Sequence, residues 1–253
     1  MLKLYYRTKF YQGISCVSTA LRTIYRNLRG KKFEPEVALL KDFISAGDVC
    51  FDIGAAYGRY ALPLSRLAGT SGKIYCFEPG TYSFNVLSFI AHFHRLRNVV
   101  LVKRALSDRD GKIKLTLPVK KSGKLGPSLA YLSAQDAPDA LSEEVQMTTI
   151  DAFCAERQIP RLDFIKCDVE GAELLVFSGG SRTIERYKSV ILSEVDAGNL
   201  AKFGHDKRKL QDFFLQAGYR IFLLEDSRLA ESGQITKDAN YLFIHRSRAM
   251  PAG

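Results

Sequence analysis

The chain has 253 residues, 46% of them hydrophobic and 25% charged, which is the ordinary composition of a single folded domain with a sizeable core. No apolar run approaches bilayer length and the first residues lack the apolar stretch of a secretory signal, so we expect a cytoplasmic protein. The net charge of +10 favours acidic partners, unless it is only a solvated basic surface. Five scattered cysteines without C-x-x-C spacing are typical of buried, reduced thiols.

The first 32 residues contain no acidic side chain, whereas basic and aromatic residues recur along them. This composition predicts a basic helical arm over residues 1–42, ahead of one α/β domain over residues 43–253. Through residues 1–32 the arm could contact an anionic membrane, a nucleic acid or another subunit, as in a peripheral membrane protein or a homodimer. The simpler alternative is a helix that covers one edge of the domain's sheet.

A buried strand, a glycine turn and a helix start follow one another over Val49–Tyr60, V-C-F-D-I-G-A-A-Y-G-R-Y. Gly54 permits a tight turn, and Gly58 permits the close approach of a helix or a ligand. The strand Lys73–Phe77 then ends at Glu78, whose two carboxylate oxygens can accept both hydroxyls of a ribose. Only two glycines occur, not the three of G-x-G-x-x-G, which favours S-adenosylmethionine (SAM) over a dinucleotide.

Strand and helix patterns alternate along the middle of the chain, which predicts a mostly parallel sheet with helices on both faces. Further helices are expected over 36–45, 82–95, 149–157 (capped by Thr149), 173–185 and 206–217. Further strands are expected over 98–103, 112–117, 145–149, 162–167, 190–194, 219–224 and 240–245, the last two as a hairpin near the far edge. Residues 119–142 read as a lid or substrate loop, or as a plain surface loop.

Four segments, D-I-G-A-A-Y-G, F-E-P-G, A-L-S-D and I-K-C-D-V-E-G-A-E, resemble those of FkbM-type SAM-dependent methyltransferases. The resemblance covers residues 43–244 and is most specific in the last segment, Ile165–Glu173; Gly80 departs from it where the family often has a second proline nearby. It implies a Rossmann-like class I methyltransferase fold with a seven-stranded, mostly parallel sheet. It also implies O-methylation of a hydroxyl on a sugar, glycolipid or secondary metabolite, so we expect a small-molecule or glycan substrate.

The predicted cofactor site draws on the glycine turn and on the ends of the neighbouring strands. Its residues are Asp52, Gly54, Ala55, Tyr57, Gly58, Glu78, Pro79, Ala105, Leu106 and Asp168. Asp52 is expected to fix the glycine turn or the amino-acid end of SAM. The resemblance implies that Asp108 borders the adenine ring; the alternative is turn chemistry before Gly111.

Acidic residues after the fourth and fifth strands are the candidate catalytic groups. Asp168, with Glu170 two residues on, could orient the substrate, act as base or balance the sulfonium charge, and His205 is the second candidate base. We expect no metal; the candidate ligands for Mg²⁺ would be Asp168, Glu194 and Asp196, unless the last two only cap the strand end or pair with lysines.

Other functions remain open at this stage. The D-V-E-G segment lacks the D/N-P-P-Y pattern of enzymes that methylate amino groups on bases, which argues against a nucleic-acid methyltransferase that uses the basic arm. An NAD(P) oxidoreductase is disfavoured by the missing third glycine. A module that binds SAM without turnover is disfavoured by the intact acidic and glycine positions.

Overall fold

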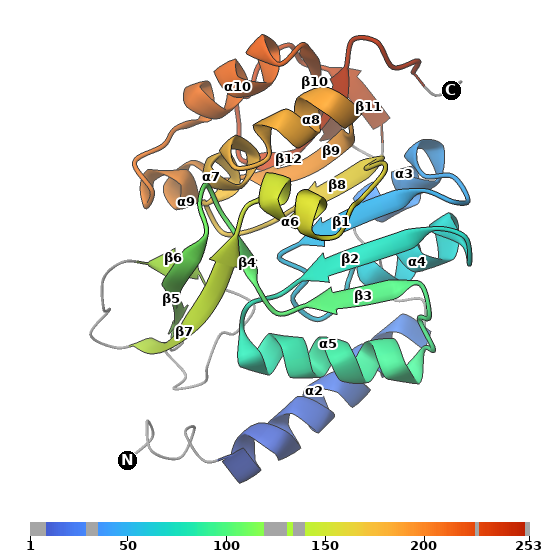
Figure 1. The fold of residues 1–253 in the computed structure, drawn as a ribbon, viewed down its shortest axis with the longest axis vertical. Helices are drawn as coiled ribbons and strands as arrows, with labels where there is room; N and C mark the ends of the chain where they lie inside the picture. Colours follow the sequence, from blue (N-terminus) through green and yellow to red (C-terminus); the bar gives the residue numbers. More distant parts are fainter. Residues whose placement is uncertain (1–8, 29–34, 119–130, 134–139, 226–227, 251–253) are drawn as a thin grey trace.

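The computed structural model describes residues 9–28, 35–118, 131–133, 140–225 and 228–250. Its main sheet has eight strands (Figure 1). In spatial order they are β11 (Arg228–Glu231), β10 (Tyr219–Glu225), β12 (Ala239–His245), β9 (Val190–Val195), β8 (Phe164–Cys167), β1 (Val49–Ile53), β2 (Lys73–Phe77) and β3 (Val99–Val102). The five strands from β9 to β3 pair in parallel, and the pairings of β12, β10 and β11 are antiparallel.

The predicted sheet of seven strands is therefore wrong, because β11 folds back onto β10 as an additional strand. The four residues of β11 include a single large apolar side chain, Leu229, which is too weak a pattern to predict a strand. The expected pairing of 219–224 with 240–245 is confirmed. The pair lies near the far edge, as predicted, with β12 between β9 and β10 and with β11 as the edge strand.

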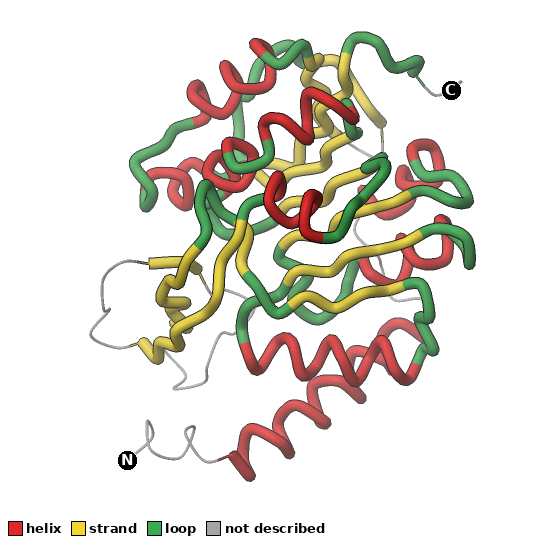
Figure 2. Tube along the Cα trace, in the orientation of Figure 1, coloured by secondary structure: helices red, strands yellow, loops and turns green. Residues whose placement is uncertain are grey.

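Helices cover both faces of this sheet, as predicted (Figure 2). One face packs against α6 (Ile150–Glu156), α7 (Glu173–Ser178), α8 (Ser181–Tyr187) and α10 (Lys207–Gln216), and the other against α3 (Pro35–Phe43), α4 (Ala61–Ala68) and α5 (Thr81–Phe93). Side chains alternate between the faces along a strand. Phe51 and Ile53 thus join the first core, and Cys50 joins the second.

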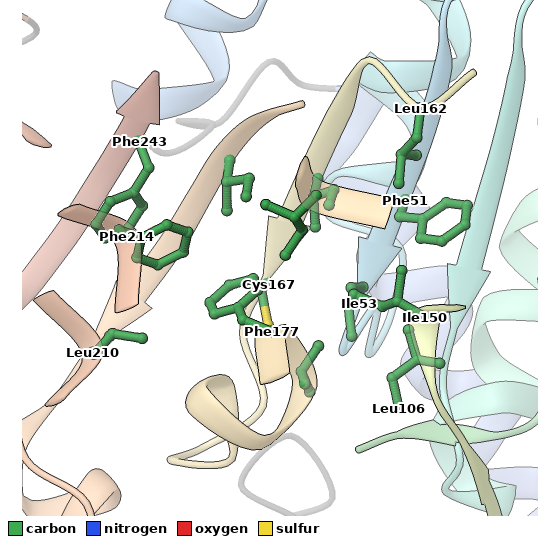
Figure 3. Close-up of a cluster of buried hydrophobic side chains, with 14 of the residues drawn as sticks. Phe51, Ile53, Leu106, Ile150, Leu162, Cys167, Phe177, Leu210, Phe214 and Phe243 are labelled. Carbon is green, nitrogen blue, oxygen red and sulfur yellow. The ribbon is translucent and has the colours of Figure 1, made fainter. Parts of the chain in front are cut away.

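The first core is aromatic and tightly packed (Figure 3). The ring of Phe214 on α10 stacks on Phe243 of β12 with centroids 3.8 Å apart. The helix predicted over 173–185 is wrong as a single element, because the chain breaks at Gly179 and Gly180. A Cβ on Gly180 would lie 2.8 Å from Ile150 of α6, and a Cβ on Gly179 would collide with the carbonyl group of Ser107, so each glycine permits a close approach. Thr149 caps α6 as expected, accepting from the Ala152 amide.

A second sheet lies beyond the carboxyl ends of β1, β2 and β3 (Figure 1). Its order is β4 (Ala105–Leu106), β7 (Ala140–Thr148), β5 (Gly111–Pro118) and β6 (Tyr131–Ser133). The strands predicted over 112–117 and 145–149 are thus confirmed in this separate sheet. The predicted loop over 119–142 needs correction, since it contains β6 and the start of β7; residues 119–130 and 134–139 lie outside the described ones.

The helix α2 (Lys9–Leu28) packs along the outside of α5 rather than over an edge of the sheet (Figure 1). The hydroxyls of Ser15 and Thr19 each lie 2.9 Å from the hydroxyl of Tyr82 on α5. The described residues include no helix with the length and apolar character needed to cross a membrane. The boundary drawn between an arm and a domain at residue 43 stays a prediction.

Candidate functional site

The glycine turn after β1 is packed against the end of β8. The amides of Gly54 and Ala55 each donate to the carbonyl oxygen of Phe77 at 3.0 Å. Gly54 has φ of +77°, and a Cβ there would collide with the carbonyl group of Asp168. Gly54 is therefore required both by its left-handed backbone and by contact with a residue 114 positions away.

The second glycine of the turn accommodates a helix, which is one of the two roles predicted for it. A Cβ on Gly58 would lie 2.7 Å from Leu87 Cδ1 of α5. Beside it, the ring of Tyr57 meets that of Tyr82 edge to face with centroids 6.4 Å apart. The helix α4 then begins at Ala61, after the turn.

Glu78 is buried directly under the glycine turn. Its Oε2 accepts from the Ala56 amide and its Oε1 from the Gly80 amide, both at 2.9 Å. Burial raises the pKa of Glu78 to about 7, and these two amides oppose the shift. A carboxylate has roughly four acceptor positions, and the two amides occupy two of them; the contact of Glu78 with a ribose stays a prediction.

The small sheet is tied to the same corner by Glu143 of β7. Its Oε1 accepts from the Thr81 amide at 2.7 Å and its Oε2 from the Thr81 hydroxyl at 2.6 Å. This contact fixes the start of α5, three residues after Glu78. The sequence analysis assigned no role to Glu143, because no local pattern indicates a partner 62 positions away.

Two neighbouring strands direct charged side chains to the face that α4 covers. Asp52 on β1 pairs in register with Lys166 on β8, and both are 2% exposed. The Nζ of Lys166 donates to the carbonyl of Cys167 at 3.2 Å and lies 3.7 Å from Asp168 Oδ2. No role was predicted for Lys166, although a lysine within an apolar strand pattern could have indicated a buried charged site.

Asp52 does not hold the glycine turn, which corrects one of its two predicted roles. Its carboxylate accepts from Cys76 Sγ at 3.9 Å, whereas the turn bonds to Phe77 and Glu78. Burial raises the pKa of Asp52 to about 7, and the charge of Lys166 opposes that rise. A contact with the amino-acid end of SAM stays a prediction.

Asp168 and Glu194 form a carboxyl pair at the ends of β8 and β9. The register pairs Lys166 with Leu192, so two residues further on Asp168 and Glu194 lie side by side on the same face. The pKa of Glu194 is raised to about 8 by its removal from water, by the negative charge of Asp168 and by a hydrogen bond between the two carboxyl groups. The neighbouring carboxylate of Asp168 therefore favours the protonated form of Glu194.

The residues after Asp168 form a strained turn locked by a buried acid. Glu170 has φ of +55°, and its Oε2 accepts from Asn199 Nδ2 at 2.8 Å; Asn199 belongs to α9 (Ala197–Ala201). Burial, then the charge of Asp168, raises the pKa of Glu170. The buried Glu173 accepts from the amides of Val169 and Gly171 at 3.1 and 3.2 Å. The D-V-E-G-A-E segment thus builds the support for Asp168, a role that sequence reasoning did not assign to Glu173.

The remaining predicted residues lie around this centre. Ala105 and Leu106 are buried in β4, next to β7, and Pro79 follows Glu78. Asp108 lies beyond them and accepts from the hydroxyl of Ser107 at 3.2 Å. His205 is partly buried, and burial lowers its pKa; Lys209, Asp206 and Asp108 are the charges that act on it. None of these contacts tests the predicted roles in adenine binding or as a base.

Asp196 caps the helix α9, accepting from the Asn199 amide at 2.7 Å, rather than the strand end predicted for it. Across the described ranges, no group of three or more histidine, cysteine, aspartate or glutamate residues is arranged to hold a metal ion. All five cysteines are buried and free.

The family described as Methyltransferase FkbM domain matches residues 52–221. The hexuronic acid methyltransferase AglP of Haloferax volcanii is 27% identical over 179 residues, which are 68% of this chain and 65% of that protein. Methyltransferase FkbM from Methylobacillus flagellatus KT has a TM-score of 0.51 at 15% identity, over 84% of this chain and 50% of that one, and shows the same fold. This chain thus spans about two thirds of one relative and half of the other. Because the family match covers more than half of the chain, the protein belongs to the FkbM family of methyltransferases.

Proposed function

We propose that the protein transfers the methyl group of SAM to a hydroxyl of a sugar. The observation that carries this proposal is the Asp168–Glu194 carboxyl pair beside the glycine turn, at the carboxyl ends of the central strands. Ligands of open α/β sheets bind at this edge. The name of the Haloferax relative, a hexuronic acid methyltransferase, favours an acidic sugar, and the net charge of +10 is complementary to such an acceptor.

The corner above β1 and β2 fits a nucleoside cofactor. Glu78 is fixed by two backbone amides and keeps acceptor positions for a ribose diol. Gly54 and Gly58 are both accounted for by packing, against Asp168 and Leu87. The turn thus has no further glycine that would let its backbone approach a diphosphate, which supports SAM rather than a dinucleotide as the cofactor.

When bound, SAM supplies an electrophilic methyl group. The chain's own residues orient the acceptor and take its proton as the oxygen–carbon bond forms. In its ionised form the Asp168–Glu194 pair accepts the hydroxyl proton, which makes the oxygen a better nucleophile. Lys166 lies behind Asp168 and favours the ionised form of the pair. Glu173 and the turn 168–172 hold the position of Asp168, on which in-line geometry depends.

Two measurements test the proposal in sequence. Calorimetry should show SAM binding to the wild type and at least about tenfold weaker binding to Glu78→Gln, because the amide would present its NH₂ group to a backbone N–H. Glu144→Gln is the control, since Glu144 is exposed and pairs with Lys112. Unchanged affinity in Glu78→Gln would remove the assigned ribose contact.

The second measurement follows methyl transfer from labelled SAM to hexuronic acids, their glycosides and neutral hexoses. We expect transfer to the acidic sugars, and a loss of more than about a hundredfold in kcat for Glu194→Gln with SAM affinity retained. Transfer to none of these sugars by a protein that binds SAM would contradict the substrate class. Full activity of Glu194→Gln would contradict the role of the pair.

A further inference from the structure

Exposed large hydrophobic side chains gather on one pair of helices. In the part of the chain that the structure describes, six such residues are found, and five of them lie on α2 or α5. These are Val17 (44% exposed), Leu21 (52%), Tyr25 (52%), Phe89 (39%) and Phe93 (50%); Met250 near the C-terminus is the sixth. A concentration of this kind marks an interaction surface, whereas scattered single residues need no explanation.

The five side chains form one face. Along α2 and along α5 they are four positions apart, so each set is a stripe on its helix. The two helices run in the same direction (Figure 1). Cys16 donates to the carbonyl of Tyr82, and Ile24 belongs to the same buried cluster as Ile90.

The packing rows of the two helices fix the side on which the stripes lie. Each α2 stripe residue follows a packing residue by one, as Val17 follows Cys16. Each stripe residue of α5 comes three positions after a packing residue, as Phe89 comes after Val86. Because the two helices are right-handed and parallel, a side chain one position after a packing residue of α2 and one three positions after a packing residue of α5 point to the same side of the helix–helix contact. We call this the α2–α5 face: Val17, Leu21, Tyr25, Phe89 and Phe93.

The two helices that form this face carry basic side chains. The helix α2 carries Arg22 and Arg26, and α5 is followed by Arg95 and Arg97. Neither helix contains an aspartate or glutamate, nor do residues 1–32 as a whole. Arg22 and Arg26 are exposed and adjoin the α2 stripe in sequence. An apolar stripe bordered by arginines on an acid-free helix is the composition of helices that lie in the plane of an anionic membrane.

We propose that the α2–α5 face docks on an anionic lipid surface. The apolar stripes enter the interfacial layer, and the neighbouring arginines contact the lipid phosphates. The helix α2 would lie flat, in accord with its lack of membrane-spanning character. The docked face adjoins the cofactor corner, because Tyr82 of α5 bonds to α2 on one side and meets Tyr57 of the glycine turn on the other. The inference is independent of which acceptor the enzyme methylates.

Co-sedimentation of the full chain with vesicles tests this proposal. One set of vesicles contains phosphatidylcholine only, and the other an equal mixture of phosphatidylcholine and phosphatidylglycerol. We expect binding to the mixed vesicles at low salt, weakening as salt is added, and little binding to phosphatidylcholine. Leu21→Glu should weaken binding at least about tenfold, and the matched control Met250→Glu should bind as the wild type does.

Charge is tested separately by two double variants with the same change in net charge. Arg22→Glu with Arg26→Glu should weaken binding at least about tenfold. Arg208→Glu with Arg246→Glu, both exposed and placed on α10 and after β12, should keep most of it. Circular dichroism and a thermal melt verify that each variant is folded.

Three outcomes would overturn the proposal. The first is a wild type that stays in the supernatant with mixed vesicles at low salt. The second is Leu21→Glu binding as tightly as Met250→Glu. The third is a dimer in sedimentation equilibrium that Leu21→Glu dissociates, without vesicle binding by either protein, since a second copy of the chain would then cover the face.

Discussion

Lys166 Nζ lies 3.7 Å from Asp168 Oδ2, although the lysine is buried inside β8 and the aspartate opens to the site. A buried ammonium group is costly unless carboxylates compensate it. Here Asp52 and Asp168 flank it on two strands, and Glu194 adjoins Asp168. The ammonium group of Lys166, which supports the candidate site, is therefore buried beneath that site.

Replacing this lysine should destabilise the protein in a pH-dependent way. In Lys166→Met the buried Asp52 loses the charge that opposes its high pKa, so above neutral pH it must be buried as an unpaired anion or be protonated. We expect a loss of about 3 kcal/mol or more at pH 8 and a smaller loss near pH 5, by urea denaturation. Lys112→Met, at an exposed pair with Glu144, is the control and should change little at either pH. Equal losses at both pH values would contradict the assigned charge balance.

The contact between Gly54 and Asp168 predicts a large difference between two glycine substitutions. Gly54 and Gly204 have nearly the same φ, +77° and +71°, but a Cβ on Gly204 would meet nothing within 4 Å. Gly204→Ala should cost about 1 kcal/mol for its backbone conformation. Gly54→Ala should cost at least about 3 kcal/mol and weaken SAM binding, because the turn or the end of β8 must move. Similar unfolding free energies for both variants would show that the turn adjusts without strain.

Glu173 should make the folded protein less stable as pH rises. Burial raises its pKa to about 7 in the folded state, and its Oε2 has no partner within the described structure. Between its ordinary pKa near 4.3 and about 7, the folded state binds the proton more tightly than the unfolded state, so stability falls over this window and levels off above it.

Glu173→Gln resembles the protonated form and removes this dependence. We expect its unfolding free energy to lie within about 1 kcal/mol of the wild-type value near pH 5 and to exceed it by roughly 3 kcal/mol near pH 8. Asp52 and Glu78, whose pKa values are also raised, remain in both proteins, so the difference reports Glu173 alone. A constant difference between the two proteins across pH is the result that would refute this account.

The effect of Asp168 on the ionisation of Glu194 can be followed without a substrate. Removing the neighbouring charge in Asp168→Asn should lower the pKa of Glu194 from about 8 by at least about one unit, and so move ionisation of the candidate base to lower pH. Carbon NMR of the labelled Glu194 carboxyl measures it directly. Asp196→Asn, which keeps a side chain able to cap α9, should leave the titration in place. An unmoved titration in Asp168→Asn would mean that the two carboxyl groups are not coupled.

Much of the fold was readable from local sequence patterns. The strand and turn over Val49–Gly54, the cap at Thr149 and the alternating strands of both sheets depend on residues that are neighbours in sequence. The prediction of a single helix over 173–185 was wrong because the break at Gly179 and Gly180 depends on their contacts with Ser107 and Ile150. A local sequence pattern does not reveal such contacts. The strand β11 was missed because its pattern is short and polar.

By itself, the sequence determined which side chains stand at the ends of the strands, and hence the family and the positions of Glu78, Asp168 and Glu194. Only the tertiary structure decided what those groups touch. The contact of Gly54 with Asp168, the clamp of Glu143 on Thr81 and the packing of α2 on α5 each join segments more than sixty positions apart. Such contacts follow from strand register and close packing of distant surfaces, which local periodicity does not encode.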